Sequence, residues 1–463
     1  MACAVAFAVP TQSTSDTVSR MVITTRSGRR ARTKHGRPGC GRIAAGAALI
    51  ATVTLAACEG GLDKAREVRQ PAWAGSSTSV VFDHHTHTRF SDGRLPMNEL
   101  VDLAAASGCQ AIAVSDHSDS PDAYSPAYLA ALATAREAHP DLMLFAGLEL
   151  EMPSYGGREH LGLVLSPLIE RQLLPRIGAA VQAAAGVDSG AEADAILLRE
   201  IRSFAADSSD ALLIYNHPSR KDRNTAENLA DFRVWTARSG RTLMLSGAPG
   251  HQAAAVPGDY RPPILTMDRW DPVVARVGGT WDRLLDEGRD VRAAIAASDF
   301  HNERKDFPPC TFARTRITVA DPSYAALLDA LNAGTFWAGH GDVLQALELS
   351  AEIDATLPLA YPGATVLLGA TDSNALVRVS IRRTAGSAGL PFTADLISNC
   401  ASGSPELVTQ LPIAALARDA RVFLPLAAAG ADGRSCYLRS RLTVERGDER
   451  LAAYTNSIRF VFP

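Results

Sequence analysis

Apolar runs alternate with longer amphipathic segments between residues 80 and 341. The runs are short, rich in Val, Ile, Leu and Ala, and bounded by polar turns, as buried strands are. Seven strands joined by helical crossovers predict an α/β protein, and they favour a distorted seven-stranded barrel over an open doubly wound sheet. The expected strands are 80–83, 111–115, 142–148, 161–165, 211–215, 241–245 and 293–298.

Helical periodicity fills several intervals between these strands. Apolar residues recur there every three or four positions, which places them on one face of a helix. No glycine-rich loop of the dinucleotide-binding or P-loop type accompanies them, so we do not expect a nucleotide site of either kind. The expected helices are 98–107, 126–139, 191–206, 226–239 and 269–287.

The pattern changes beyond residue 341. Short strand-like segments separated by Gly, Ser, Asp and Pro turns take over, with little helix. Their even spacing predicts a C-terminal β-sandwich over 342–463, after a barrel over 80–341. The expected strands are 346–353, 375–383, 392–398, 420–426, 436–444 and 457–462.

The N-terminal region has the features of an export signal. A basic segment over 26–37 precedes an apolar run over 43–57, which is shorter than the roughly 20 residues of a membrane span. Leu-Ala-Ala-Cys at 55–58 resembles the lipobox of bacterial lipoproteins, in which the Cys is lipidated; the alternative is an ordinary cleavage site. We therefore expect a signal peptide over 1–58 and a polar tether over 59–79. The mature protein would be an exported bacterial lipoprotein of the cell envelope, touching the membrane only through lipid on Cys58.

Charge narrows the choice of partners. The net charge is -4, the pI is about 6.3, and only four of the 46 basic residues are lysines. Basic residues form no run outside the N-terminal region, so the sequence does not favour binding to duplex nucleic acid. A small-molecule substrate is the expected partner.

The cysteines do not indicate a thiolate metal site, because no pair has CxxC spacing. Outside the cytoplasm, Cys400 and Cys436 could form a disulfide. Cys109 precedes an expected strand and is interpreted as a small core residue.

Histidines and carboxylates gather where the expected strands end. His85 and His87 follow the first strand two residues apart, so their side chains face the same side of an extended chain. His160 is the exception, because it opens the fourth strand. Six of the 11 histidines belong to this set, which suits Zn, Mn or Fe. The candidate ligands are His85, His87, Asp92, His117, Glu149, His160, His217, Asp299 and His301.

These motifs resemble those of the PHP (polymerase and histidinol phosphatase) metallohydrolases. The similar elements occur in one order over residues 80–340: DxHxH at 83–87, SDG at 91–93, SDH at 115–117, GxE at 147–149, His160, His-Pro at 217–218 and SDxH at 298–301. The resemblance implies a distorted barrel holding two or three divalent ions. It implies one ion on His85, His87, Glu149 and Asp299, a second on Glu149, His160 and His217, and a third on Asp92, His117 and His301.

The reaction implied by the resemblance is hydrolysis by a metal-activated water, with Glu149, Asp299 and His217 as the central catalytic ligands. A phosphoester is the favoured substrate. An ester or carbamate is the alternative, because residues 299–302 and the loop at 247–252 look more like the carbaryl-hydrolase branch. A non-catalytic metal-binding surface module, with the sandwich recognising glycans or protein, is a second alternative.

Substrate contacts are expected near the ligand motifs. His251 follows the sixth strand, and four cations closely follow ligands, where they could bind an anionic group; the other interpretation is a solvated charged rim and ordinary loop structure. Asp116 is expected to fix the tautomer of a ligand histidine. The candidate cations are Arg220, Lys221, Arg304 and Lys305.

Overall fold

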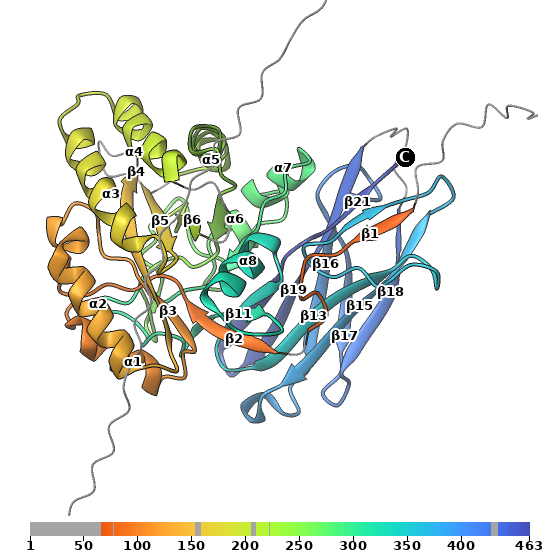
Figure 1. Cartoon of the computed structure of the whole chain (residues 1–463). Helices are drawn as coiled ribbons and strands as arrows, with labels where there is room; N and C mark the ends of the chain where they lie inside the picture. Colours follow the sequence, from red (N-terminus) through yellow and green to blue (C-terminus); the bar gives the residue numbers. More distant parts are fainter. Residues whose placement is uncertain (1–65, 77, 153–158, 205–209, 222, 427–433) are drawn as a thin grey trace, which may run out of the picture. The chain divides into compact units, whose positions relative to one another are not determined.

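A 16-stranded mixed sheet runs through the described part of the chain, accompanied by a three-stranded and a two-stranded sheet (Figure 1). The computed structural model describes residues 66–463 except 77, 153–158, 205–209, 222 and 427–433. The expectations for the signal peptide, Cys58 and residues 59–65 therefore lie outside the described residues. No helix in the described part of the chain has the length and apolar character required to span a bilayer.

Seven strands of the large sheet match the seven expected from the apolar runs. They lie side by side in chain order, and all adjacent pairs are parallel except the two made by β5, which is antiparallel to both neighbours. Most of their residues are buried, as in strands covered on both faces. The strands are β2 (Ser79–Asp83), β3 (Ala111–Val114), β4 (Met143–Met152), β5 (Glu159–Leu165), β6 (Ala211–Asn216), β7 (Met244–Ser246) and β10 (Ala293–Ile295).

A closed barrel is not confirmed. Within the described residues the strand order ends at β10, and the far side of β2 pairs with β11 (Ala313–Thr318) instead. The segments that follow β2 and β10, the first and last of the seven strands, nevertheless lie close together, because Thr86 and Phe300 form an isolated parallel bridge. The peptide N–H of His87 also donates to the carbonyl of Phe300 at 2.9 Å.

Helices cover the seven strands (Figure 1). Apolar residues of α1 to α5 share one core with the outward side chains of the strands. Inward side chains of the strands form a second core with α8. The prediction missed α3 and α8. The helices are α1 (Met97–Ala106), α2 (Pro126–Ala138), α3 (Glu170–Ala185), α4 (Gly190–Phe204), α5 (Thr225–Ser239) and α8 (Tyr324–Ala333), with a 3-10 turn η1 (Pro121–Tyr124).

The single helix expected over 269–287 is wrong. Two short helices, α6 (Pro272–Ala275) and α7 (Thr280–Asp286), occupy this segment. Asp271 caps α6 by accepting a hydrogen bond from the Val273 N–H at 2.7 Å. Gly278 then adopts φ +72, a left-handed conformation that ends helices.

The region beyond residue 341 is built from strands, as predicted. β13 (Leu344–Glu352), β15 (Asn374–Arg383) and β18 (Asp419–Pro425) form the three-stranded sheet. Its apolar side chains share one core with those of the other strands in this region. β20 pairs with β12, so the large sheet continues across residue 341. The other elements are β12 (Phe336–His340), β14 (Thr365–Leu367), β16 (Phe392–Ser398), β17 (Glu406–Ile413), β19 (Ser435–Arg446), β20 (Glu449–Thr455), β21 (Ile458–Val461) and the 3-10 turn η3 (Ala385–Ser387).

Part of the segment expected to be a tether is structured. β1 (Glu67–Arg69) pairs antiparallel with β14. Arg66 forms ion pairs with Asp354 and Asp372 at 2.5 and 2.9 Å. The chain is thus attached to the C-terminal strands before it enters β2. The two-stranded sheet consists of β8 (Gln252–Ala253) and β9 (Val256–Pro257).

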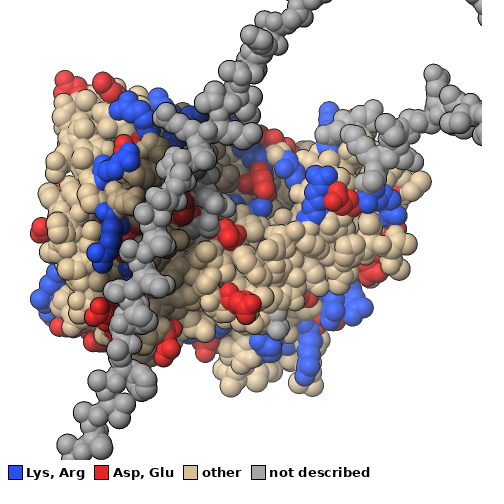
Figure 2. Space-filling view, viewed as in Figure 1, with Lys and Arg blue, Asp and Glu red and all other residues tan. Residues whose placement is uncertain are grey.

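Charged side chains of both signs are interspersed over a mainly uncharged surface on the face shown in Figure 2. No uniformly basic stripe is visible on that face, in keeping with the nearly balanced count of 46 basic and 50 acidic residues.

Two disulfides are present among the described residues. Cys400–Cys436 is bonded as expected. Cys109 is a buried core residue, as expected, but it is also bonded to Cys310 across 201 residues of sequence, which was not predicted. Both cysteines are buried. Cys109 lies just before β3, and Cys310 lies between β10 and β11, where its N–H donates to Asp83 at the end of β2. The bond therefore links the first and last parts of the seven-stranded region.

We expect the Cys109→Ser/Cys310→Ser variant to lose more stability than the Cys400→Ser/Cys436→Ser variant. Chain entropy alone gives roughly 5 kcal/mol for a loop of 201 residues and roughly 4 kcal/mol for one of 36. The free energy of unfolding in urea measures the difference. An equal or reversed order would show that loop length does not control the contribution of these bonds.

Candidate metal centre

The candidate ligands meet at one edge of the seven strands. β2, β3, β4 and β6 run in the same direction, so the residues that follow or end them lie together. His160 is the one candidate at the beginning of a strand and not at its end. Because β5 runs antiparallel to its neighbours, its register still places His160 beside Glu151 of β4 and Asn216 of β6. The beginning of β5 therefore lies at the same edge as the ends of its neighbours.

A buried carboxylate, Glu149, occupies the centre of this edge. Its Oε1 lies 3.0 Å from His85 Nε2, 2.9 Å from His160 Nδ1 and 3.1 Å from His217 Nε2. The side-chain N–H of Asn216 donates to the same oxygen at 3.0 Å. The other oxygen, Oε2, faces His87 Nε2 at 3.5 Å and His117 Nδ1 at 3.3 Å.

Asp299 adds a second carboxylate next to the first histidine pair. Its Oδ1 lies 3.1 Å from His85 Nε2 and 3.2 Å from His87 Nε2. Buried Asp83 holds the segments that carry His85 and Asp299 together. Its carboxylate accepts hydrogen bonds from the backbone N–H groups of His85, Ser298 and Cys310 at 3.1–3.3 Å. Asp83 thus joins the end of β2 to the segment that carries Asp299.

A third group lies at the exposed side of the centre. Asp92 Oδ1 is 3.2 Å from His301 Nε2, 3.7 Å from His117 Nε2 and 3.8 Å from His87 Nδ1. The Asp92 side chain is 59% exposed, whereas the other ligand candidates are mostly buried. This side is therefore where a substrate would enter.

Asp116 and Gly93 hold the turn that carries Asp92. The expectation that Asp116 fixes a ligand histidine is wrong, because its carboxylate accepts hydrogen bonds from Thr88 and Ser91 at 2.6–2.7 Å. Gly93 packs against the backbone of His87, and a Cβ there would lie 2.3 Å from its carbonyl oxygen. The SDG motif is thus required by close packing of the turn.

All nine predicted ligands fall into groups whose donor atoms lie within 4.8 Å of one another. Two groups match those implied by the resemblance, and the third also includes His87. Glu151 joins His117 and His160 in a fourth group, and Asp306 joins His251 and His301 in a fifth. The sequence prediction missed both acids, although Glu151 lies two residues after Glu149 and so faces the same side of β4.

The donor atoms fit a metal. Buried imidazole nitrogens normally have hydrogen-bond partners, yet several here have none although they lie against carboxylates. A cluster of nitrogen and oxygen donors without thiolates suits Zn, Mn or Fe. Among the ligand candidates, the buried atoms without a hydrogen bond include His85 Nε2, both ring nitrogens of His87, His117 Nδ1, His160 Nδ1 and Asp299 Oδ1.

The charges of the centre are strongly coupled. Burial opposes ionisation of Glu149, but His160 and His85 outweigh it and hold the pKa of this carboxyl well below its usual value. Burial likewise opposes the charged form of His160, yet Glu149 and Glu151 raise its pKa to about 10. Burial and the nearby His301 keep the pKa of His87 well below its usual value. Metal binding would have to displace the proton on His160, since ligand imidazoles are neutral.

Backbone strain is concentrated in the same place. His217, His251 and Asp299 have positive φ angles of 27, 39 and 51. Such conformations cost on the order of 1–3 kcal/mol each outside glycine and often mark functional sites. The surrounding contacts of these side chains hold the backbone in these conformations.

The predicted substrate contacts divide into two sets. His251 Nδ1 lies 2.9 Å from Asp306 Oδ1, and its ring lies 4.6 Å from that of His301, so it borders the centre. Arg220 is 14% exposed, with Nη1 3.5 Å from Asp299 Oδ2. Lys221 is exposed. Burial raises the pKa of Glu151, but His160, His117 and, with a smaller effect, Lys221 together hold it below its usual value. Arg304 and Lys305 are exposed.

Comparison with known proteins supports the motif assignment. Residues 83–202 match the family model of the PHP domain. The resemblance inferred from the motifs is therefore confirmed for this segment, which contains six of the nine ligand candidates. His217, Asp299 and His301 lie beyond it.

Solved structures give distant similarities. A two-domain protein from Bacteroides vulgatus, described as containing a predicted PHP-like metal-dependent phosphoesterase, is 15% identical and covers 86% of this chain and 100% of its own, with a TM-score of 0.42. An amidohydrolase from Chromobacterium violaceum is 19% identical and covers 49% of this chain and 89% of its own, with a TM-score of 0.28. Comparison with curated proteins finds no match.

We expect more than one equivalent of transition metal per chain, and we expect Glu149→Gln to lower it, because this carboxylate belongs to two of the groups. Glu151→Gln is unsuitable as a control, since Glu151 Oε1 lies 3.1 Å from His160 Nε2. Glu303→Gln, at an exposed position two residues after His301, is the matched control. Elemental analysis of purified protein measures the change. Equal metal content in the two variants would contradict the central position of Glu149.

Proposed function

We propose that this protein is a metal-dependent hydrolase with a PHP-type barrel, a C-terminal β-sandwich and two or three divalent ions. The observation that carries the proposal is the buried Glu149 carboxylate facing five imidazoles, several of whose buried nitrogens lack hydrogen bonds. A cluster of this kind is expensive to bury without a ligand to bind. The PHP match over 83–202 supports the same conclusion.

The three ligand groups would each hold one ion. Bound ions of this type activate water for attack and stabilise charge on the attacked and leaving oxygens. Glu149, Asp299 and His217 would fix the two inner ions, and Asp92 would present the outer one to the open side. The contacts that hold His217 and Asp299 in their strained backbone conformations would keep these ligands in place before substrate arrives.

A phosphoester is the favoured substrate because Arg220 lies at the centre. Its guanidinium is close enough to Asp299 to form an ion pair and to lower the pKa of His217, after the larger effect of burial. Guanidinium groups bind phosphate oxygens strongly in such partly enclosed positions. Arg220 is thus suited to bind an anionic substrate beside the ions.

Ester or carbamate hydrolysis remains the alternative. Three of the four expected rim cations, Lys221, Arg304 and Lys305, are exposed. The fourth, Arg220, is already opposed by the Asp299 carboxylate. A neutral substrate would require no further positive charge.

Arg220→Ala should distinguish these substrates. We expect kcat/KM for p-nitrophenyl phosphate to fall at least about tenfold, which corresponds to about 1.4 kcal/mol of transition-state binding. The rate for neutral p-nitrophenyl acetate should change little. Arg171→Ala, at an exposed position on α3, is the control, and metal content is measured in parallel. An unchanged phosphoester rate, with faster turnover of the acetate, would support the alternative.

We also propose that the protein is an exported lipoprotein. The lipobox-like Leu-Ala-Ala-Cys at 55–58 motivates the proposal. Two disulfides support it, because structural disulfides are typical of oxidising compartments outside the cytoplasm.

Cys58→Ser should prevent lipidation. We expect the wild-type protein to fractionate with membranes and the variant to be released or to keep its signal peptide. Cys40→Ser, within the segment expected to be removed, should behave as wild type. Metabolic labelling with a fatty acid, followed by fractionation, measures both effects. Wild-type protein without label would refute the anchor.

A further inference from the structure

A cavity of about 220 Å³ lies apart from the metal centre. Its wall includes Ser79 at the start of β2 and Thr318 at the end of β11, which are paired in the sheet. The ligand histidines follow the other end of β2. The cavity therefore opens at the opposite end of this strand from the metal centre, and it contains none of the nine ligand candidates.

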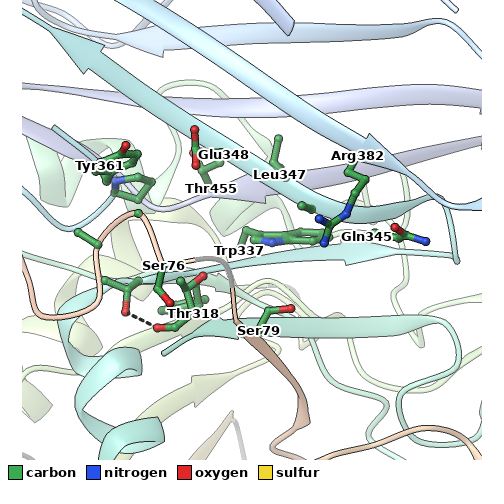
Figure 3. A pocket seen from close by; sticks show the side chains of 16 residues that line it. Ser76, Ser79, Thr318, Trp337, Gln345, Leu347, Glu348, Tyr361, Arg382 and Thr455 are labelled. Carbon is green, nitrogen blue, oxygen red and sulfur yellow. Dashed lines mark hydrogen bonds between the residues drawn. The ribbon is translucent and has the colours of Figure 1, made fainter. Parts of the chain in front are cut away.

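Segments that are distant in sequence form the walls of this cavity (Figure 3). The described wall residues come from 74–76 and Ser79, the paired strands β11 and β12, the paired strands β13 and β15, residues 361–362, and Thr455 at the end of β20. Gly75 fits only as glycine, because its φ is +72 and a Cβ would lie 3.1 Å from the Tyr361 ring. The N-terminal segment is thus packed closely onto the C-terminal strands to complete one wall.

The aromatic ring of Trp337 forms part of the cavity wall. In the view of Figure 3 it lies between Leu347 on one side and Thr318 and Ser79 on the other. The residue is only 7% exposed, and Arg316, its cross-strand partner, lies 5.7 Å from the ring centroid. Buried tryptophan provides a rigid apolar surface that loses little entropy when a ligand packs on it.

Charged and polar side chains border this ring. Glu348 of β13 and Arg382 of β15 project from the same face of the three-stranded sheet, since Arg382 pairs with Ala346 and Glu348 is two residues further on. Neither side chain forms a hydrogen bond or ion pair with another described residue. The other cation diagonal to Glu348, Arg378, is held by Asp419 at 2.6 Å. Gln345 adds an amide at the cavity wall.

The charged pair and the indole together favour one class of ligand. Diagonal neighbours on antiparallel strands have backbones roughly 7–8 Å apart, and the side chains of Glu348 and Arg382 are drawn apart from each other in Figure 3. An amino-acid zwitterion could pair its ammonium group with Glu348 and its carboxylate with Arg382, so it is the rival occupant that the experiment tests. Glu348 would repel a compact dianion such as phosphate. A polyol ring with hydroxyls around its rim and an apolar face could contact both charged groups and the indole.

We propose that this cavity binds a monosaccharide unit, packed on Trp337 and hydrogen-bonded by Glu348 and Arg382. The volume is below the roughly 300–1,000 Å³ of pockets for drug-sized ligands, which suits a single sugar ring. Burial raises the pKa of Glu348 against the opposing effect of Arg378. A carboxylate in this environment gains most from accepting ligand hydroxyl hydrogen bonds.

Calorimetric titration of the full chain with D-glucose, N-acetyl-D-glucosamine and D-glucuronate tests the proposal. At least one sugar should bind saturably, and chelator treatment should not change its affinity, because the cavity contains no metal ligand. Glu348→Gln and Arg382→Ala should each weaken binding at least about tenfold, about 1.4 kcal/mol. Glu352→Gln, on the same strand but outside the cavity, and Arg421→Ala should bind as wild type.

The rival occupants are tested by L-phenylalanine and inorganic phosphate. Stronger binding of either than of every sugar would overturn the proposal, as would the absence of any sugar binding. Sugar binding that both cavity variants retain would place the site elsewhere and would also overturn it. Since hydrolase activity is not the readout, these outcomes are independent of the proposed reaction.

Discussion

The burial of one carboxylate, Glu149, among five imidazoles is the interaction on which the rest of the centre depends. An isolated buried charge is very costly, so it must be compensated by nearby groups. The compensating histidines follow or occupy β2, β3, β5 and β6, on both sides of β4. Their approach requires those strands to lie in one order and register. Asp83 then connects the same edge to the segment that follows β10, and the Cys109–Cys310 bond links the start of β3 to the segment before β11.

The sequence predicted the strand-end position of these ligands but could not predict strand direction. Hydrophobic periodicity is the same for a strand running either way, so β5 was expected like the others and His160 looked like an exception. The sequence also could not predict the disulfide between Cys109 and Cys310. The two residues are 201 positions apart, and only the folded strands bring them together. The break between α6 and α7 was readable from Gly278 and Gly279.

The limits of prediction at the site follow from side-chain direction. Most of the nine ligands lie on strands or shortly after them, where alternation helps to fix the face of each residue, whereas Asp92 lies in a turn. Glu151 obeys the same rule as Glu149 and could have been included. Arg220 and Arg304 both follow ligand motifs on loops, where spacing carries no such rule, and the structure places one beside Asp299 and leaves the other exposed. Sequence therefore specified the metal centre better than the substrate contacts.

Trp337 of the sugar-binding cavity lies on the same sheet as the strands of the metal centre, whereas Glu348 and Arg382 belong to the three-stranded sheet. β12 carries Trp337 and pairs with β11, which pairs with β2, and the ligand pair His85 and His87 follows β2. Buried contacts such as the Arg439–Asp282 ion pair, with Nε and Oδ1 2.6 Å apart, fasten the C-terminal strands to α7. Regulation between two sites requires an element with two arrangements that each ligand stabilises differently. A fully packed sheet provides a rigid connection instead, so a sugar bound at Trp337 would hold the hydrolase near its glycan rather than switch its activity.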